Sequence, residues 1–293
     1  MEDYLIKSVT EDGNFRAYAV TTTNLVAEAQ KRHDTWASAS AALGRTLTGT
    51  LLLASSVLKG DDEMTVKIDG GGPVGGIVVD GTANGIVKGY IQNPHVNLEP
   101  KSVGHIDVAA AVGTDGFITV TKDQGFGDPF TGQVPLSSGE IGDDFTYYLA
   151  KSEQIPSAVG VSVFVNPDFT IGAAGGFLVQ LLPGAEDDAI SALEKKLGEM
   201  PLLSKMLLDG HTPESILEFL FGEGQVNFID KVPVKFECDC SKEKFAERMA
   251  SLPASDLQEI IDEDHGAQVV CQFCENKYEY SEADLKQILA NQK

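Results

Sequence analysis

Four cysteines are the residues of this chain whose type and spacing predict chemistry most clearly. Cys238 and Cys240 form a C-x-C pair, and Cys271 and Cys274 form a C-x-x-C pair, with thirty residues (241 to 270) between the pairs. Zinc prefers four thiolates in a tetrahedron, and two cysteines one or two residues apart can supply one edge of it. Thiols that served only as buried apolar side chains would not cluster in this way. The pattern therefore predicts one zinc ion per chain, bound by all four cysteines.

The same thiols are suited to sensing oxidation. A disulfide within a C-x-C pair closes a small, strained ring, so it is readily reduced again. Zinc keeps the sulfurs as thiolates, the reactive form, and shields them from casual oxidation. Because a metal supplies much of the folding free energy of a module of about sixty residues, oxidation of its ligands should release the metal and unfold the module.

Two other functions fit the cysteines. One is a structural zinc module for protein interaction, which would keep its zinc in the presence of oxidant. The other is a thiol oxidoreductase that uses Cys271 and Cys274, which requires a free thiol of low pKa and no tightly held metal. The lack of a βαβ pattern around this pair counts against the oxidoreductase.

His265 and several cations lie near the cysteines in the sequence. His265 precedes Cys271 by six residues, but four thiolates already complete a zinc site, so we expect it to end a helix before Gly266. The cations could stabilise a centre of formal charge −2 or could form an ordinary solvated surface. They are Lys231, Lys235, Lys242, Lys244 and Arg248.

No motif predicts an enzyme. Gly70-x-Gly72-x-x-Gly75 matches a dinucleotide-binding fingerprint, but Pro73 interrupts it and the β-type residues 77–79 follow, where the fingerprint requires a helix. We expect turn glycines. No Walker lysine follows, and G-x-S-x-G and H-E-x-x-H are absent from the sequence, so we expect no catalytic residue and no bound ATP or organic cofactor. The remaining histidines are scattered and predict structural or exposed roles: His33, His95, His105 and His211.

Composition limits the partners. The chain has 293 residues, 22 Lys+Arg and 44 Asp+Glu, for a formal net charge of −22. Such a surface repels nucleic acid and anionic membranes, and its charge helps to keep a protein soluble. The N-terminus has no basic and apolar signal pattern, and the apolar stretch 43–58 is too short and too polar to span a bilayer. We expect a cytoplasmic protein.

The first 182 residues predict a mixed α+β domain. Helical patterns cover Asn24–Arg32, Trp36–Leu58 and Gly139–Lys151, and the small residues of the second suit close packing against a sheet. The β-rich runs are Tyr4–Val9, Phe15–Val20, Met64–Ile68, Gly76–Val79, Gly85–Ile91, Phe117–Thr121 and Val159–Val165.

Residues 183–230 predict a helical linker. Ile190, Leu193 and Leu197 form an apolar stripe, and Thr212 with Pro213 predicts the start of another helix. This segment is more apolar than a solvated spacer requires. It either packs permanently against the first domain or hides a switchable surface for binding other proteins.

Residues 231–293 predict a small zinc-binding, redox-switch domain. We expect a strand at Val232–Glu237, a helix at Lys242–Leu252 capped by Ser241, and a helix with a Ser255–Gln258 capping box that ends at Gly266. A strand–knuckle–strand over Ala267–Tyr280 and a last helix after Ser281 complete this domain.

Nearly the whole chain resembles the redox-regulated heat-shock chaperonins of 33 kilodaltons. The C-x-C…C-x-x-C tail is diagnostic of that family, and further strings match it: Gly70–Gly75, Val87–Tyr90 with Asn93-Pro94, Thr131–Pro135, Ser138–Ile141, Tyr147-Tyr148, Ser152–Gln154 and Gly175–Phe177. The resemblance implies an ATP-independent holdase of the stress response that binds unfolded or misfolded client proteins. Its reduced, zinc-bound form is inactive, and oxidants with mild unfolding activate it.

The resemblance also implies roles for individual residues. Cys238, Cys240, Cys271 and Cys274 are the zinc ligands and the switch, with disulfides Cys238–Cys240 and Cys271–Cys274 in the oxidised form. The segment 186–222 corresponds to the linker that melts and exposes the client-binding surface, and the activated form is a homodimer.

Overall fold

The fold is α+β, as predicted, and it divides into two compact units, residues 1–237 and 238–293. The computed structural model describes residues 2–101, 106–125 and 127–292, so His105 lies outside the described residues. No helix within these ranges is both long and apolar enough to cross a bilayer.

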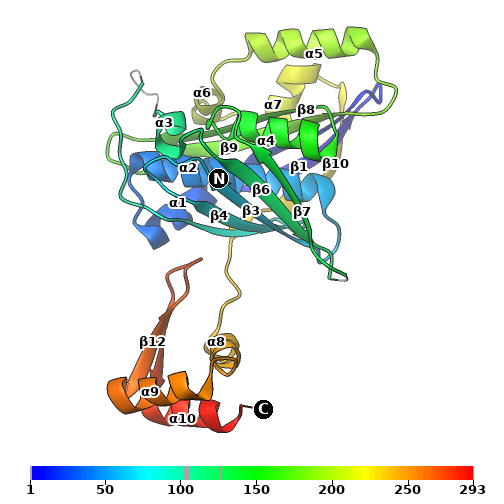
Figure 1. Cartoon of the computed structure of the whole chain (residues 1–293). Helices are drawn as coiled ribbons and strands as arrows, with labels where there is room; N and C mark the ends of the chain where they lie inside the picture. The colour runs from blue at the N-terminus through cyan, green and yellow to red at the C-terminus, as the bar shows by residue number, and fades with distance from the viewer. Residues whose placement is uncertain (1, 102–105, 126, 293) are drawn as a thin grey trace. The chain divides into compact units, whose positions relative to one another are not determined.

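The first unit contains two sheets (Figure 1). The five-stranded first sheet is antiparallel throughout, in the order β10-β1-β2-β9-β8. Its strands are β1 (Tyr4–Thr10), β2 (Phe15–Thr21), β8 (Ser157–Val165), β9 (Ile171–Leu181) and β10 (Val226–Pro233). The second sheet has the order β11-β5-β4-β3-β6-β7, in which only β11 runs parallel to its neighbour. Its strands are β3 (Glu63–Asp69), β4 (Ile77–Thr82), β5 (Ile86–Ile91), β6 (Phe117–Asp123), β7 (Phe130–Pro135) and β11 (Lys235–Phe236).

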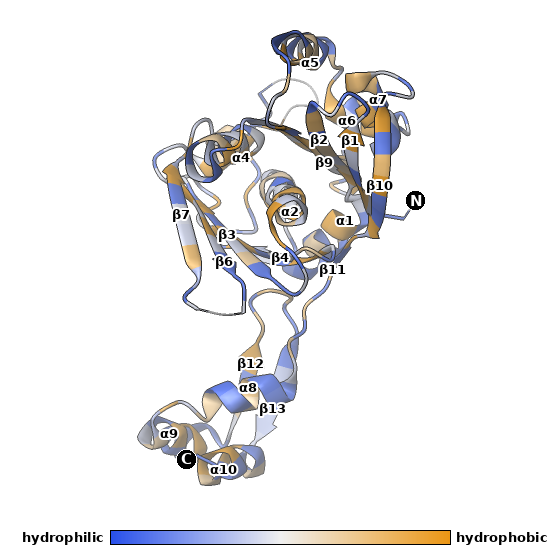
Figure 2. Ribbon diagram, turned by 90° about the vertical axis from the view of Figure 1, so that its right-hand side faces the viewer, coloured by the Kyte–Doolittle hydropathy of each residue, from blue (hydrophilic) through white to orange (hydrophobic). Residues whose placement is uncertain are grey.

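Helix α2 (Ala37–Val57) lies between the two sheets, as Figure 2 shows. Its small residues permit close packing, as predicted. A side chain at Gly49 would come within 2.3 Å of the Phe145 ring, and one at Gly44 within 2.6 Å of Val26. The other helical segments of this part are α1 (Thr23–His33), α3 (Val108–Val112), α4 (Gly142–Tyr148) and the π-helix η1 (Leu149–Glu153).

Three helices of the predicted linker cover the other face of the first sheet: α5 (Asp187–Glu199), α6 (Leu203–Leu208) and α7 (Pro213–Phe221). Thr212 caps α7, as predicted, because its hydroxyl accepts a hydrogen bond from the Ser215 amide at 3.2 Å. Leu193, Met206 and Leu217 are buried in one cluster with Phe15 and Val179 of the sheet. The apolar stripe therefore packs in a cluster with residues of the first sheet.

The strand Val232–Glu237 was predicted with the wrong bounds. Two strands replace it, and both belong to the first unit: Lys231 in β10 lies opposite Ile6 of β1, and Lys235 in β11 lies opposite Ile86 of β5. The compact C-terminal unit therefore begins at Cys238, whereas the sequence pattern placed the boundary at residue 231.

The second unit is small. Strands β12 (Gly266–Val270) and β13 (Lys277–Ser281) pair antiparallel, and the helices are α8 (Lys242–Met249), α9 (Ala254–Asp264) and α10 (Glu282–Ala290). Ser241 and Ser281 cap α8 and α10, as predicted. The Ser255–Gln258 capping box is wrong: Pro253 is the N-cap residue of α9, and the Ser255 hydroxyl bonds to Asp256 instead. The buried core has five residues that are not cysteines: Leu257, Ile261, Tyr280, Leu285 and Ile288.

Candidate metal and redox centre

A tight turn between β12 and β13 presents the second cysteine pair, as the strand–knuckle–strand pattern predicted. The Cys271 amide donates to the Asn276 carbonyl at 2.9 Å, while the Cys271 carbonyl accepts from Cys274 at 3.2 Å and from Glu275 at 2.7 Å. Glu275 has a φ of 60°, the left-handed conformation that reverses the chain at this point. These bonds hold the two thiols on one side of the turn.

The first pair lies on the segment that leads into α8. The Tyr278 hydroxyl, from β13, donates to the Cys240 carbonyl at 2.9 Å and lies 3.2 Å from the Cys240 sulfur. Tyr278 therefore fixes the C-x-C pair beside the turn. No sequence motif predicts this role of Tyr278, whose one signal in the sequence is its place four residues after Cys274, on a strand of the knuckle.

The four sulfurs converge as predicted. All of them lie within 4.8 Å of one another, with Cys238 and Cys240 half-buried and Cys271 and Cys274 buried. The Cys238 and Cys271 sulfurs are 3.8 Å apart, and those of Cys240 and Cys274 are 3.4 Å apart. Zinc–sulfur bonds of about 2.3 Å in a tetrahedron place the sulfurs about 3.8 Å apart. The cluster therefore has the size and the chemistry of a site that can bind a metal such as zinc.

All four thiols are free of disulfide bonds. The short sulfur–sulfur distances above join one pair to the other, as in a tetrahedron that both pairs share. The disulfides within each pair remain a prediction.

The thiols differ in acidity. Burial opposes ionisation of Cys240, but hydrogen bonds from Tyr278 and the neighbouring thiols outweigh it and lower the pKa of Cys240 to about 7. Burial raises the pKa of Cys238 to about 11, and it also raises that of Cys274. The hydrogen bond to Cys240, followed by burial, raises the pKa of Tyr278 to about 12, so this hydroxyl keeps its proton. Cys240 is therefore the most acidic of these three thiols.

His265 lies outside the sulfur cluster, as predicted. It is the left-handed C-cap of α9, with a φ of 54°, and its Nδ1 lies 3.7 Å from a carboxylate oxygen of Glu282. Lys244 forms an ion pair with Asp239, and Lys242 lies 3.0 Å from Asp284. Both lysines are half exposed, which favours the interpretation of an ordinary charged surface.

The rejected dinucleotide motif is a turn, as predicted. Gly71 and Gly75 have φ values of 73° and 66° between β3 and β4. The three described histidines of the first unit occupy separate places: His33 is buried at the end of α1, His95 pairs with Asp34, and His211 lies 3.1 Å from the Ser215 hydroxyl.

Comparisons with known proteins agree with one another. The family model described as Hsp33 protein matches residues 3–281. A 33 kDa chaperonin of Lactiplantibacillus plantarum is 66% identical over 293 residues, which cover 100% of this chain and 99% of that protein. A 33 kDa chaperonin of Enterococcus faecalis is 54% identical, covering 97% of this chain and 95% of that protein. The crystal structure of a 33 kDa chaperonin from Thermotoga maritima is 35% identical, covers 99% of this chain and 98% of that one, and has a TM-score of 0.91.

Proposed function

Because the chain belongs to the Hsp33 family, we propose that its four cysteines hold one zinc ion in the reduced state and are the switch of its activity. Like its family, it is a redox-regulated holdase rather than an enzyme, and its partners are unfolded client proteins. The observation that carries the proposal is the convergence of four thiols within 4.8 Å in this protein.

Zinc would be held by Cys238, Cys240, Cys271 and Cys274. When bound, it cross-links the two cysteine pairs and stabilises their thiolates. The chain's own residues prepare the site: the knuckle orients Cys271 and Cys274, and Tyr278 orients Cys240. Since the non-cysteine core has only five buried residues, the fold of this unit depends strongly on the metal.

Activation is the oxidation of the thiols by a peroxide. A thiolate attacks the peroxide to give a sulfenic acid, and the partner thiol displaces the sulfenic oxygen as water. Each disulfide thus takes two electrons from two thiols, reduces one peroxide and releases two molecules of water when the oxidant is hydrogen peroxide. We propose the pairs Cys238–Cys240 and Cys271–Cys274. When all four sulfurs are in disulfides, no thiolate remains to bind a metal. The C-terminal unit then loses the zinc that joined its two cysteine pairs, and it unfolds.

The linker carries the change to the client-binding surface. We propose residues 1–182 as the chaperone core, 183–230 as a metastable linker and 231–293 as the redox-switch domain, of which the compact part begins at Cys238. Cys238 follows β11 after a single residue, so unfolding of the C-terminal unit frays the chain at β11 and then at β10. Strand β10 contributes Val226 to the cluster that holds the linker helices. Loss of this edge exposes the apolar faces of α5 to α7. We further propose that the activated protein is a homodimer and that it acts in the cytoplasm.

One experiment tests this function. Zinc release and suppression of client aggregation are followed together while the reduced protein is treated with hydrogen peroxide, and a dithiol reductant is then added with zinc. We expect both signals to rise together and to reverse together. Zinc that stays bound under peroxide would indicate a structural zinc module, and disulfide reductase activity without tightly bound zinc would indicate an oxidoreductase.

A further inference from the structure

Strand β8 is an unusual edge of the first sheet. Its nine residues, Ser-Ala-Val-Gly-Val-Ser-Val-Phe-Val, include no charge and no proline. The opposite edge strand, β10, contains Asp230, Lys231 and Pro233, and the edge strand β7 of the second sheet ends in Pro135. Charges and prolines normally prevent edge strands from pairing with other chains. Strand β8 lacks this protection and is a template for pairing.

Helix α4 covers the first half of the β8 edge, and its first residue lies near the Val161 nitrogen, which would be 3.7 Å from a side chain at Gly142. The Val159 amide donates to the Thr146 hydroxyl at 3.0 Å, and a side chain at Gly142 would come within 3.0 Å of the Val159 carbonyl oxygen. The backbone of Val159 thus faces away from β9. Because alternate residues of a strand face the same way, the N–H and C=O groups of Val161 and Val163 also face outward. Among the described residues, none forms a hydrogen bond with these groups.

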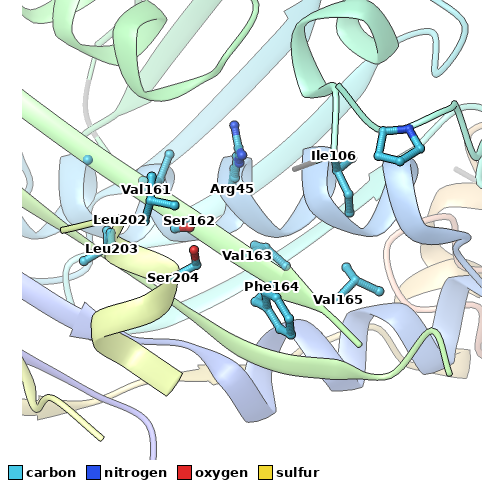
Figure 3. Close-up of a pocket in the computed structure, with 12 residues that line it drawn as sticks. Arg45, Ile106, Val161, Ser162, Val163, Phe164, Val165, Leu202, Leu203 and Ser204 are labelled. Atoms are coloured by element: carbon cyan, nitrogen blue, oxygen red, sulfur yellow. The ribbon is translucent and has the colours of Figure 1, made fainter. Parts of the chain in front are cut away.

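A groove of about 300 Å³ runs along the uncovered half of the edge (Figure 3). Residues 160–165 of β8 form one wall, Arg45 and Ile106 lie on another side, and the start of α6 closes it with Leu202 and Leu203. Leu202 is 57% exposed. The Arg45 Nη1 atom donates to Glu140 at 2.8 Å, but its buried Nε has no hydrogen-bond partner among the described residues. The groove thus offers unused backbone groups beside apolar side chains.

We propose that the free half of β8 holds an unfolded client by backbone pairing, as an added antiparallel or parallel strand over residues 161–165. This inference rests on the proposed holdase function and specifies its binding mode. The client segment is extended and apolar, because β8 carries no charge and apolar side chains line the groove, and it is not acidic, because a protein of net charge −22 repels acidic segments. Backbone hydrogen bonds do not depend on side-chain identity, which suits a protein that binds many clients.

The linker controls access to this edge. Helix α6 packs on β8 and β9. Its Leu207 side chain lies so close to Gly175 of β9 that a side chain at Gly175 would come within 3.2 Å of it. Release of the linker therefore removes one wall of the groove and uncovers the small residues of β9 next to it. The edge is partly open in the reduced state and fully open in the activated one.

The test uses full-length oxidised protein and two kinds of variant. Val163→Pro removes the outward N–H of Val163, and proline is tolerated on an edge where the N–H faces solvent. Val163→Ala is its matched control, because it shortens the same buried side chain and keeps the N–H. Ser162→Lys places a charge on the edge, and Thr131→Lys places the same charge on the exposed edge strand β7. Circular dichroism and zinc content establish that each variant folds in the reduced state.

The binding probe is a fluorescent, end-blocked, seven-residue peptide of alternating threonine and valine. We expect V163P to bind it about tenfold more weakly than V163A, as for the loss of a backbone hydrogen bond. We expect S162K to bind about tenfold more weakly than T131K, which should bind like the unaltered protein. A peptide N-methylated at every residue, which has no backbone donor on either edge, should bind weakly to all of them. Hydrogen exchange of the Val161 and Val163 amides should slow when the plain peptide binds.

The outcomes separate this inference from the holdase function. If oxidised protein fails to suppress client aggregation, the proposed function fails. If it suppresses aggregation while V163P matches V163A, or while the two edge amides exchange unchanged, the function stands and clients bind elsewhere. If the edge amides become protected on oxidation without peptide, in proportion to protein concentration, the edge joins two copies of the chain and the client assignment is overturned.

Discussion

Truncation of one buried leucine tests whether packing on the first sheet holds the linker closed. Leu217 of α7 has no exposed surface, and it lies in the cluster with Phe15 and Val179. A buried Leu→Ala change costs about 2–5 kcal/mol, because contacts are lost and a cavity remains. We expect L217A to lower the free energy of local opening of residues 187–221 by this amount in the reduced, zinc-loaded protein.

Hydrogen exchange measured by mass spectrometry reports the free energy of local opening of residues 187–221. A loss of 2–5 kcal/mol corresponds to about 30- to 4,000-fold faster exchange of the linker amides. The control is L208A in the neighbouring helix α6, because Leu208 is 46% exposed. A surface change of this kind shifts stability by at most about 0.5 kcal/mol, or about twofold in exchange. We also expect L217A to reach full client holding at a lower peroxide dose.

Two results would refute the reasoning. Equal exchange of α7 in L217A and L208A would mean that this cluster does not hold the linker. Acceleration of the central strands β2 and β9 together with α7 would mean that the linker opens only when the whole first unit unfolds.

Three further predictions follow from the geometry. Protein purified under reducing conditions should contain one zinc per chain. A Cys→Ser change at any of the four cysteines should make limited proteolysis cut residues 238–293 before it cuts the first unit. Equal protection of residues 238–293 from the protease in mutant and parent would contradict this. Burial raises the pKa of Asp3 to about 6, above an unfolded value of about 3.9. Ionisation of Asp3 thus costs the folded state about 2 kcal/mol after allowance for screening. The free energy of unfolding of the parent, relative to that of D3N, should therefore fall as pH rises from about 4 to about 6. If denaturant titrations give the same difference in unfolding free energy between parent and D3N at pH 4 and at pH 7, this prediction is wrong. A chain that ends at Asp230 lacks the end of β10 and all of β11, so it should hold clients without oxidant; an inactive, folded truncation would argue against control by the C-terminal part.

The cysteine cluster could be predicted from sequence because its information is local. Two chelating pairs of cysteines specify a tetrahedral site wherever the fold brings them together, and the structure places the four sulfurs within 4.8 Å. Tyr278 could not be predicted, because its role depends on its hydroxyl reaching Cys240 across the knuckle, at 2.9 Å from the carbonyl oxygen. A tyrosine in a short strand has no sequence signal for such a contact.

The sequence patterns did not predict strand β9, and its composition explains why. Residues 172–176 are Gly-Ala-Ala-Gly-Gly, which lack the β-branched and aromatic residues that normally indicate a strand. Their small size is required by packing on both faces: a side chain at Gly176 would come within 3.1 Å of Leu52 in α2, and one at Gly175 within 3.2 Å of Leu207 in α6. Close packing on both faces of β9 therefore requires small residues, and these residues give no strand signal in the sequence. Strand β11 has two residues, which is too short for any alternation to show.

Hydrogen exchange across residues 187–221 during a peroxide titration tests the central claim most directly. Samples are quenched at each dose and divided between exchange analysis and a client-aggregation assay. We expect the linker amides to lose protection at the same dose at which client holding appears, while strands β3 and β6 of the second sheet stay protected. A linker that remains protected in oxidised protein that already suppresses aggregation would contradict it.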